Sequence, residues 1–169
     1  MSERRGLSPT AAGIAFFVCV PLVMAGVIPW WMTRWQFQPP LLDIDAGRWL
    51  GAIMIAIGLP LLISAIAWLA HEGVKPYPPI KRLITNGPFA YTRNPMYLGV
   101  VLVMTGQGLL LGSRGVFIYG LSWFTAFYIF EITIDDPFIR KHIGQPYDDY
   151  MKNVPCWIQR RPRRAKTVK

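Results

Sequence analysis

The sequence has few charged residues, cysteines and histidines for a chain of its length. Charged side chains make up 16% of the 169 residues, whereas a soluble domain carries about 25%. Hydrophobic residues make up 53% and are grouped in long runs, which excludes a water-soluble globule. Cys19 and Cys156 are far apart, as are His71 and His142. We therefore expect neither a disulfide nor a structural metal.

Four apolar runs approach or exceed the length that crosses a bilayer, about 20 helical residues. We expect an all-α integral membrane protein whose single domain, 1–169, contains helices over about 11–33, 48–70, 96–112 and 115–134. Pro21 and Pro29 predict kinks rather than breaks, because neighbouring helices can bind the freed carbonyls. Arg4 and Arg5 before the first run are also compatible with a secretory signal peptide. The run is longer than such a peptide needs and no convincing cleavage site follows, so we expect a retained helix.

The basic residues predict an orientation. Fifteen of the 18 Lys and Arg fall on one side of the predicted helices, and only Arg34, Arg48 and Arg114 fall on the other. The positive-inside bias places both termini in the cytoplasm, in a bacterial or archaeal type of cytoplasmic membrane. The net charge of +9 lies beside helix ends, so we expect anionic lipid headgroups rather than nucleic acid as partners. Four tryptophans would form an outer aromatic belt, Trp30, Trp31, Trp35 and Trp49.

Two segments on the cytoplasmic side connect or follow the helices. Residues 71–95 contain five prolines and predict an irregular loop. In 135–169, which we expect to be a C-terminal cytoplasmic segment, apolar residues recur at spacings of three and four. This pattern predicts an amphipathic segment that lies on the membrane or caps the helices.

Three carboxylates gather where the fourth run meets the cytoplasm. Glu131 lies within an apolar run and Asp135 follows four residues later, on the same helical face, with Asp136 beside it. An ionisable residue inside a membrane is a functional candidate because burying its charge costs several kcal/mol. The alternative is that the aspartates only end the helix in water and that Glu131 reaches the interface.

A second cluster, Gly87 to Gly99, directly precedes the third helix and reads GPFAYTRNPMYLG. A turn, an extended step before Pro95 and a helix start account for its glycine and prolines. They do not account for Arg93, Asn94 or the tyrosines.

Together these two blocks resemble the isoprenylcysteine carboxyl methyltransferase and phospholipid methyltransferase superfamily. The resemblance extends over about Lys81 to Arg161, from the GPFxYxRNPMYxG pattern through Asp135-Asp136-Pro137 to Val154-Pro155-Cys156-Trp157. The order of both blocks makes it specific. It implies methyl transfer from S-adenosylmethionine to a lipid-like acceptor, in a cytoplasm-facing pocket closed by the loop and the C-terminal segment.

The resemblance also implies roles for individual residues. Independently of the resemblance, we expect Arg93 and Glu131 to be the catalytic residues. Cofactor-contacting positions would be Lys81, Arg82, Leu83, Ile84, Phe89, Asn94, Pro95, Met96, Tyr97, Asp135 and Asp136. Aromatic rings suit the adenine and the sulfonium, and the two aspartates, at the usual paired-glutamate position, would hold the ammonium group.

Three departures from the family pattern bear on the acceptor. Asn94 stands where the family more often has histidine, and the aspartates are one methylene shorter than glutamates. Glu131 stands where carboxyl methyltransferases have an arginine that meets the substrate carboxylate. A glutamate there favours an amine acceptor over a prenylated or lipidic carboxylate. A non-catalytic membrane scaffold of the same fold is a third interpretation, and the oligomeric state is left open.

Overall fold

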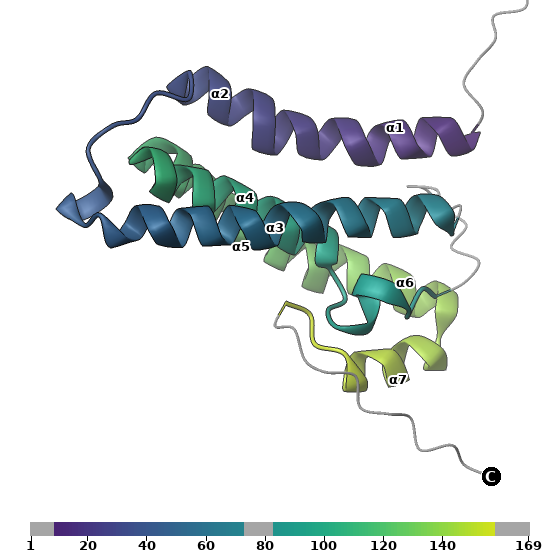
Figure 1. The fold of residues 1–169 in the computed structure, drawn as a ribbon. Coiled ribbons are helices and arrows are strands. Elements are labelled where there is room, and N and C mark those ends of the chain that lie inside the picture. The colour runs from purple at the N-terminus through teal and green to yellow at the C-terminus, as the bar shows by residue number, and fades with distance from the viewer. Residues whose placement is uncertain (1–8, 73–82, 158–169) are drawn as a thin grey trace, which may run out of the picture.

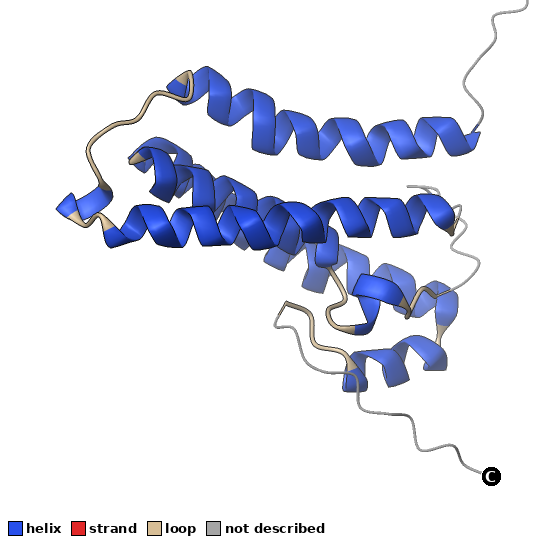
Figure 2. Ribbon diagram, viewed as in Figure 1, coloured by secondary structure: helices blue, strands red, loops and turns tan. Residues whose placement is uncertain are grey.

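The structure is a computed structural model that describes residues 9–72 and 83–157, and within these ranges it contains helices and turns but no strand (Figure 2). Three helices are long and apolar enough to cross a membrane, Ala15–Thr33, Ala46–His71 and Arg114–Ile143. A fourth apolar helix, Pro95–Leu111, is shorter. The expected all-α integral membrane fold is therefore confirmed, while Lys81, Arg82 and the end of the basic tail lie outside the described residues.

The first apolar run folds as one helix with a wide turn in its middle. In chain order it comprises α1 (Pro9–Leu22), a π-helical segment (Val23–Val27) and α2 (Ile28–Thr33). Pro29 has no N–H to donate to the carbonyl of Ala25, four residues earlier. The Gln107 side chain, on a neighbouring helix, donates to this carbonyl at 2.6 Å. A neighbouring helix thus binds a carbonyl that the proline leaves free, as we expect for a kinked membrane helix.

The next two helices are held together by glycines. α3 (Ala46–His71) runs antiparallel to α4 (Pro95–Leu111). A Cβ at Gly51 would lie 2.5 Å from the Gly106 carbonyl oxygen, and a Cβ at Gly99 would lie 2.9 Å from that of Gly58. Each helix carries its two glycines seven residues apart, or about two turns, so the close approach recurs along the contact.

A tight hairpin joins α4 to α5 (Arg114–Phe130), in agreement with the two-residue gap between the predicted helices 96–112 and 115–134. Gly112 ends α4 with a left-handed φ of 73°, a conformation that glycine adopts without a Cβ penalty. Ser113 then accepts a hydrogen bond from the Val116 backbone N–H and begins α5. Glycines again allow close packing, because a Cβ at Gly108 would lie 2.5 Å from Phe117 Cα.

The last membrane helix extends further than the sequence predicts. We expected it to end near residue 134, but the chain passes from α5 through a π-helical segment (Glu131–Asp135) into α6 (Asp136–Ile143). Pro137 does not stop the helix, because the π-helical segment directly before it changes the pattern of backbone hydrogen bonds where Pro137 has no N–H to donate. Gly144, with a φ of 73°, ends α6 and leads into α7 (Gln145–Asn153).

The length of the last helix places the acidic cluster near one membrane boundary. The 30 residues Arg114–Ile143 span about 45 Å as a helix, longer than a hydrocarbon core of about 30 Å. If the charged Arg114 marks one boundary, about 20 residues reach the other, near residue 134. Figure 1 shows the start of α1, the end of α3 and helices α6 and α7 at the same end of the bundle.

Candidate active site

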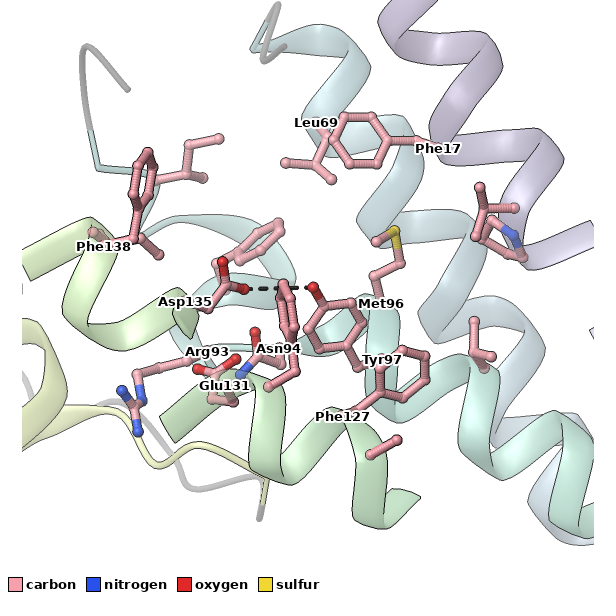
Figure 3. A pocket seen from close by; sticks show the side chains of 18 of the residues that line it. Phe17, Leu69, Arg93, Asn94, Met96, Tyr97, Phe127, Glu131, Asp135 and Phe138 are labelled. Carbon is pink, nitrogen blue, oxygen red and sulfur yellow. Dashed lines mark hydrogen bonds between the residues drawn. The ribbon is translucent and has the colours of Figure 1, made fainter. Parts of the chain in front are cut away.

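A cavity of about 690 Å³ lies at this end of the bundle. Its wall is mainly apolar and comes from α1, the end of α3, the segment before α4, the first turns of α4, the helix from α5 to α6, and α7. Figure 3 shows aromatic and aliphatic side chains around a small group of polar ones, which includes Asn94, Tyr97, Glu131 and Asp135. An apolar cavity with a few convergent polar groups is typical of a small-molecule site.

Glu131 is the most deeply buried charged side chain of the cavity. It is 1% exposed and hydrogen-bonds to Asn94, but its Oε2 has no hydrogen-bond partner among the described residues. A buried carboxylate oxygen without a partner is unfavourable. The cavity therefore offers an acceptor for an N–H group or a cation of a bound molecule.

Asp135 also lines the cavity, one turn further along the π-helical segment. Its Oδ2 accepts a hydrogen bond from the Tyr97 hydroxyl at 3.4 Å (Figure 3). The Tyr97 ring stacks on Phe127, with centroids 4.5 Å apart and planes 5° apart. Carboxylates and aromatic faces thus meet on one side of the cavity, and this combination can bind a cation.

Asp136 has different partners. Its Oδ1 lies 2.7 Å from Arg93 Nη1 and accepts a hydrogen bond from the Tyr147 hydroxyl. Burial acts to lower the pKa of Arg93, but the hydrogen bond and charge of Asp136 outweigh it and hold the pKa above its usual value. Burial and Asp136 raise the pKa of Tyr147. Arg93 is therefore a cation, and Tyr147 a hydroxyl donor, at every physiological pH.

The segment before α4 is tied to the C-terminal segment by several hydrogen bonds. The Thr92 hydroxyl donates to the Cys156 carbonyl at 2.7 Å, and the Arg93 backbone N–H donates to the Pro155 carbonyl at 3.1 Å. The Tyr150 hydroxyl donates to the Phe89 carbonyl at 2.6 Å. These bonds hold α7 and residues 154–157 against the segment that contains Arg93.

A comparison with models of protein families supports the resemblance that the two sequence blocks indicate. The sequence profile of the phospholipid methyltransferase family matches residues 46–146, more than half of the chain. The chain belongs to this family. The match starts at α3, so it extends the resemblance, which began at about Lys81, across an additional helix.

Two further relatives of this family member carry the name protein-S-isoprenylcysteine O-methyltransferase. The protein from Schizosaccharomyces pombe is 31% identical over 77 residues, 45% of this chain and 32% of the relative. The protein from Dictyostelium discoideum is 27% identical over 138 residues, 78% of this chain and 56% of the relative. The chain thus spans between about a third and about half of the length of these relatives. No solved structure matches the chain.

In this phospholipid methyltransferase family member, most of the predicted site residues that the structure describes lie around one cavity. The wall includes both residues that we expect to be catalytic, Arg93 and Glu131, and seven of the implied cofactor positions, Leu83, Ile84, Phe89, Asn94, Met96, Tyr97 and Asp135. Pro95 is buried at the start of α4 and is not part of the wall. Asp136 is not part of the wall either and contacts Arg93 and Tyr147.

Several residues of the site carried no signal that identified their role. Trp123 and Phe127 line the cavity, but in the sequence they are two of many apolar residues in a membrane helix. Tyr147 and Tyr150 belong to the resemblance and to the amphipathic pattern. Neither pattern indicates that Tyr147 contacts Asp136 or that Tyr150 binds the loop before α4.

Proposed function

We propose that the protein transfers a methyl group from S-adenosylmethionine to a lipid-like acceptor at the membrane boundary. The observation that carries this proposal is the buried Glu131 carboxylate, with an unpartnered oxygen, in a mainly apolar cavity. Phe16, Val20 and Phe130 line this cavity and are exposed. We infer that the cavity opens between α1 and α5, where a hydrocarbon chain can enter from the bilayer.

The residues of the cavity fit S-adenosylmethionine, which when bound supplies an electrophilic methyl group. Asp135 would hold its ammonium group, and the Tyr97–Phe127 stack would face its cationic or aromatic part. The apolar wall excludes water and fixes the orientation of both bound molecules. Family membership and the names of the relatives support this activity.

Two acceptor chemistries follow from different observations. The name of the relatives specifies O-methylation of isoprenylcysteine, and Arg93 lines the cavity with a buried Nε that has no partner among the described residues. Both support a lipidic carboxylate. Glu131 supports an amine headgroup instead, because its charge would repel a carboxylate and attract an ammonium. Once the amine is neutral, Glu131 can accept its proton during methyl transfer.

We also propose that the site faces the cytoplasm. The positive-inside bias of the sequence supports this orientation. In the structure, the start of α1 and helix α7 lie at the same end of the bundle as the cavity (Figure 1). Anionic headgroups would then lie next to the basic C-terminal segment.

One labelling experiment tests the activity and separates the acceptors. The protein in lipid nanodiscs is incubated with methyl-tritiated S-adenosylmethionine and, in parallel, with phosphatidylethanolamine, a farnesylated N-acetylcysteine or total lipid extract. A methyl ester releases its label in mild alkali, whereas an N-methyl group keeps it. We expect labelled lipid, and the alkali step identifies the acceptor. Binding of S-adenosylmethionine without any labelled lipid would contradict the acceptor class, and no binding at all would favour the scaffold interpretation.

A further inference from the structure

The two neighbouring aspartates at the end of the π-helical segment have opposite surroundings. Asp136 is 14% exposed at its side chain and forms an ion pair with Arg93, whose side chain is 11% exposed. The Tyr147 hydroxyl binds the same carboxylate oxygen of Asp136. The charge of Asp136 is thus compensated within the protein, and Asp136 is not part of the cavity wall.

Asp135 has no cationic partner among the described residues. The hydrogen bond that it accepts from the Tyr97 hydroxyl is 3.4 Å long, which is longer than most O–H···O bonds. It lines the cavity together with Glu131, whose unpartnered Oε2 independently indicates that this wall receives a donor group. A cation in the cavity would therefore meet uncompensated negative charge from Asp135 and not from Asp136.

The helix geometry explains why the pair divides in this way. Asp135 and Asp136 are consecutive residues of a helical segment, so their side chains leave it in different directions. The Asp136 backbone N–H donates to the carbonyl of Glu131, five residues earlier, which is the π-helical pattern. This local geometry directs Asp135 to the cavity and Asp136 to Arg93 and α7.

We infer that the two aspartates have separate roles: Asp135 binds the ammonium group of the methyl donor, and Asp136 is a positioning residue. Asp136 fixes Arg93 in the cavity wall and, through Tyr147, fastens α7 over the cavity. The part of this inference that concerns the donor rests on the proposed function. The part that concerns α7 rests only on contacts within the protein.

The experiment compares two ligands that differ only at the amino-acid end. S-adenosylhomocysteine carries the ammonium and carboxylate groups, and 5′-methylthioadenosine has the same adenosine thioether without them. Their affinities are measured calorimetrically on the full chain in nanodiscs, for the wild type and for Asp135→Asn, Asp136→Asn and Tyr147→Phe. Hydrogen exchange of residues 145–153 without ligand is measured on the same samples. Asp149→Asn is the matched control, because Asp149 is an exposed aspartate of α7.

The two readouts should separate the variants. In Asp135→Asn, the preference for S-adenosylhomocysteine over 5′-methylthioadenosine should fall by about ten- to a hundredfold, the scale of one charged hydrogen bond. Exchange of α7 should not change. In Asp136→Asn and Tyr147→Phe, α7 should exchange faster and both ligands should weaken by the same factor, so the preference is kept. Asp149→Asn should resemble the wild type in both readouts.

Two results would overturn the inference. One is an Asp136→Asn protein that loses the ligand preference while α7 stays protected, and the other is an Asp135→Asn protein that keeps the preference. If the wild type binds neither ligand, the proposed function fails, but exchange of α7 in Asp136→Asn and Tyr147→Phe still tests the positioning role. Unchanged exchange in both variants would then contradict it.

Discussion

At the scale of single residues, the site depends on a few polar side chains whose burial in apolar surroundings costs free energy. Glu131 is buried with one unpartnered oxygen, while Arg93 and Asp136 compensate each other. The low polarity around such groups strengthens their interactions with a bound molecule. Substitutions that change charge without changing shape should therefore have large effects on binding and turnover.

Glu131→Gln tests the role of the buried charge in the choice of acceptor. If the acceptor is an amine, turnover should fall by about a hundredfold, the lower end of the usual contribution of a general base. Affinity for S-adenosylhomocysteine should stay the same, because Asp135 is intact. Both are measured in nanodiscs with phosphatidylethanolamine as acceptor. Full turnover of the amine in Glu131→Gln would remove this role, and higher turnover of a farnesylated cysteine would identify a carboxylate acceptor.

Cys156 provides a test of burial beside Asn94, a residue of the cavity wall. Burial raises the pKa of its thiol to about 11, and the thiol accepts a hydrogen bond from Asn94 at 3.6 Å. Because only the thiolate is alkylated, the rate with iodoacetamide should rise about tenfold per pH unit from pH 7 to 10. The measurement uses Cys19→Ala protein. A rate that levels off near pH 8.5, the value of a free thiol, would show that Cys156 is not buried as described.

At the scale of elements, two backbone features position the site. Glycine contacts fix α3 against α4, which sets where the segment before α4 begins. The π-helical segment before α6 sets the directions of the acidic side chains. Each feature allows a substitution with a closely matched control.

Gly51→Ala should destabilise the α3–α4 contact. Its Cβ would lie 2.5 Å from a backbone carbonyl, and such overpacking typically costs about 1–3 kcal/mol. Gly47→Ala, in the first turn of α3, is the control because its Cβ would meet nothing within 4 Å. Alanine there should be neutral or stabilise by up to about 1 kcal/mol. Thermal unfolding in detergent compares the two, and equal unfolding temperatures would contradict the tight contact.

Pro137→Ala tests what maintains the π-helical segment. Alanine restores an N–H that can donate to the carbonyl of Thr133, so an ordinary α-helix becomes available. The π-helical turn contains one residue more than an α-helical turn. If that residue were absorbed into an α-helix, the carboxylates that follow the turn would rotate by about 100° around the helix axis. We expect affinity for S-adenosylhomocysteine to fall by about tenfold or more, as for a lost charged hydrogen bond. Pro146→Ala is the control, because Pro146 is exposed in the first turn of α7. Unchanged affinity in Pro137→Ala would mean that the Arg93–Asp136 pair alone holds this geometry.

At the scale of the whole molecule, the site lies at one end of a helical bundle and belongs to no single element. The tryptophans of the predicted aromatic belt, Trp30, Trp31, Trp35 and Trp49, are exposed on α2, just after it and on the first turn of α3. This is the end opposite to the cavity (Figure 1). The exposed tryptophans thus lie at one end of the bundle and the cavity with its charged residues at the other, as expected for two different membrane interfaces.

The orientation predicts the behaviour of reporter fusions. A reporter fused after Lys169 should be active only in a form that works in the cytoplasm, because fifteen of the 18 basic residues are on that side. A reporter inserted near Asp43 should behave in the opposite way. If the end of the chain proves accessible from the outer side, the proposed cytoplasmic access of the methyl donor is wrong.

The sequence by itself determined the class of fold and the family, and it indicated nine of the 24 residues that line the cavity. Long apolar runs require helices in a membrane, because every backbone polar group must be satisfied internally. The motif before α4 and the acidic block at the end of the fourth run were sufficient to indicate the family and residues such as Asn94, Tyr97 and Asp135. These signals are local, so they can be read without coordinates.

Only the tertiary structure decided how the two blocks meet. The resemblance implies the same role for Asp135 and Asp136, and the structure distinguishes them because Asp136 contacts Tyr147 and Arg93, which is 43 residues away. The sequence does not indicate that the last helix continues past Pro137, because proline usually ends a helix and no local pattern predicts the π-helical segment before it. Trp123 and Phe127 join the site only because α5 packs beside α4 and turns this face to the cavity. Hydrophobicity specifies that such residues are buried or face lipid, but the partner of each face is set by packing between distant helices.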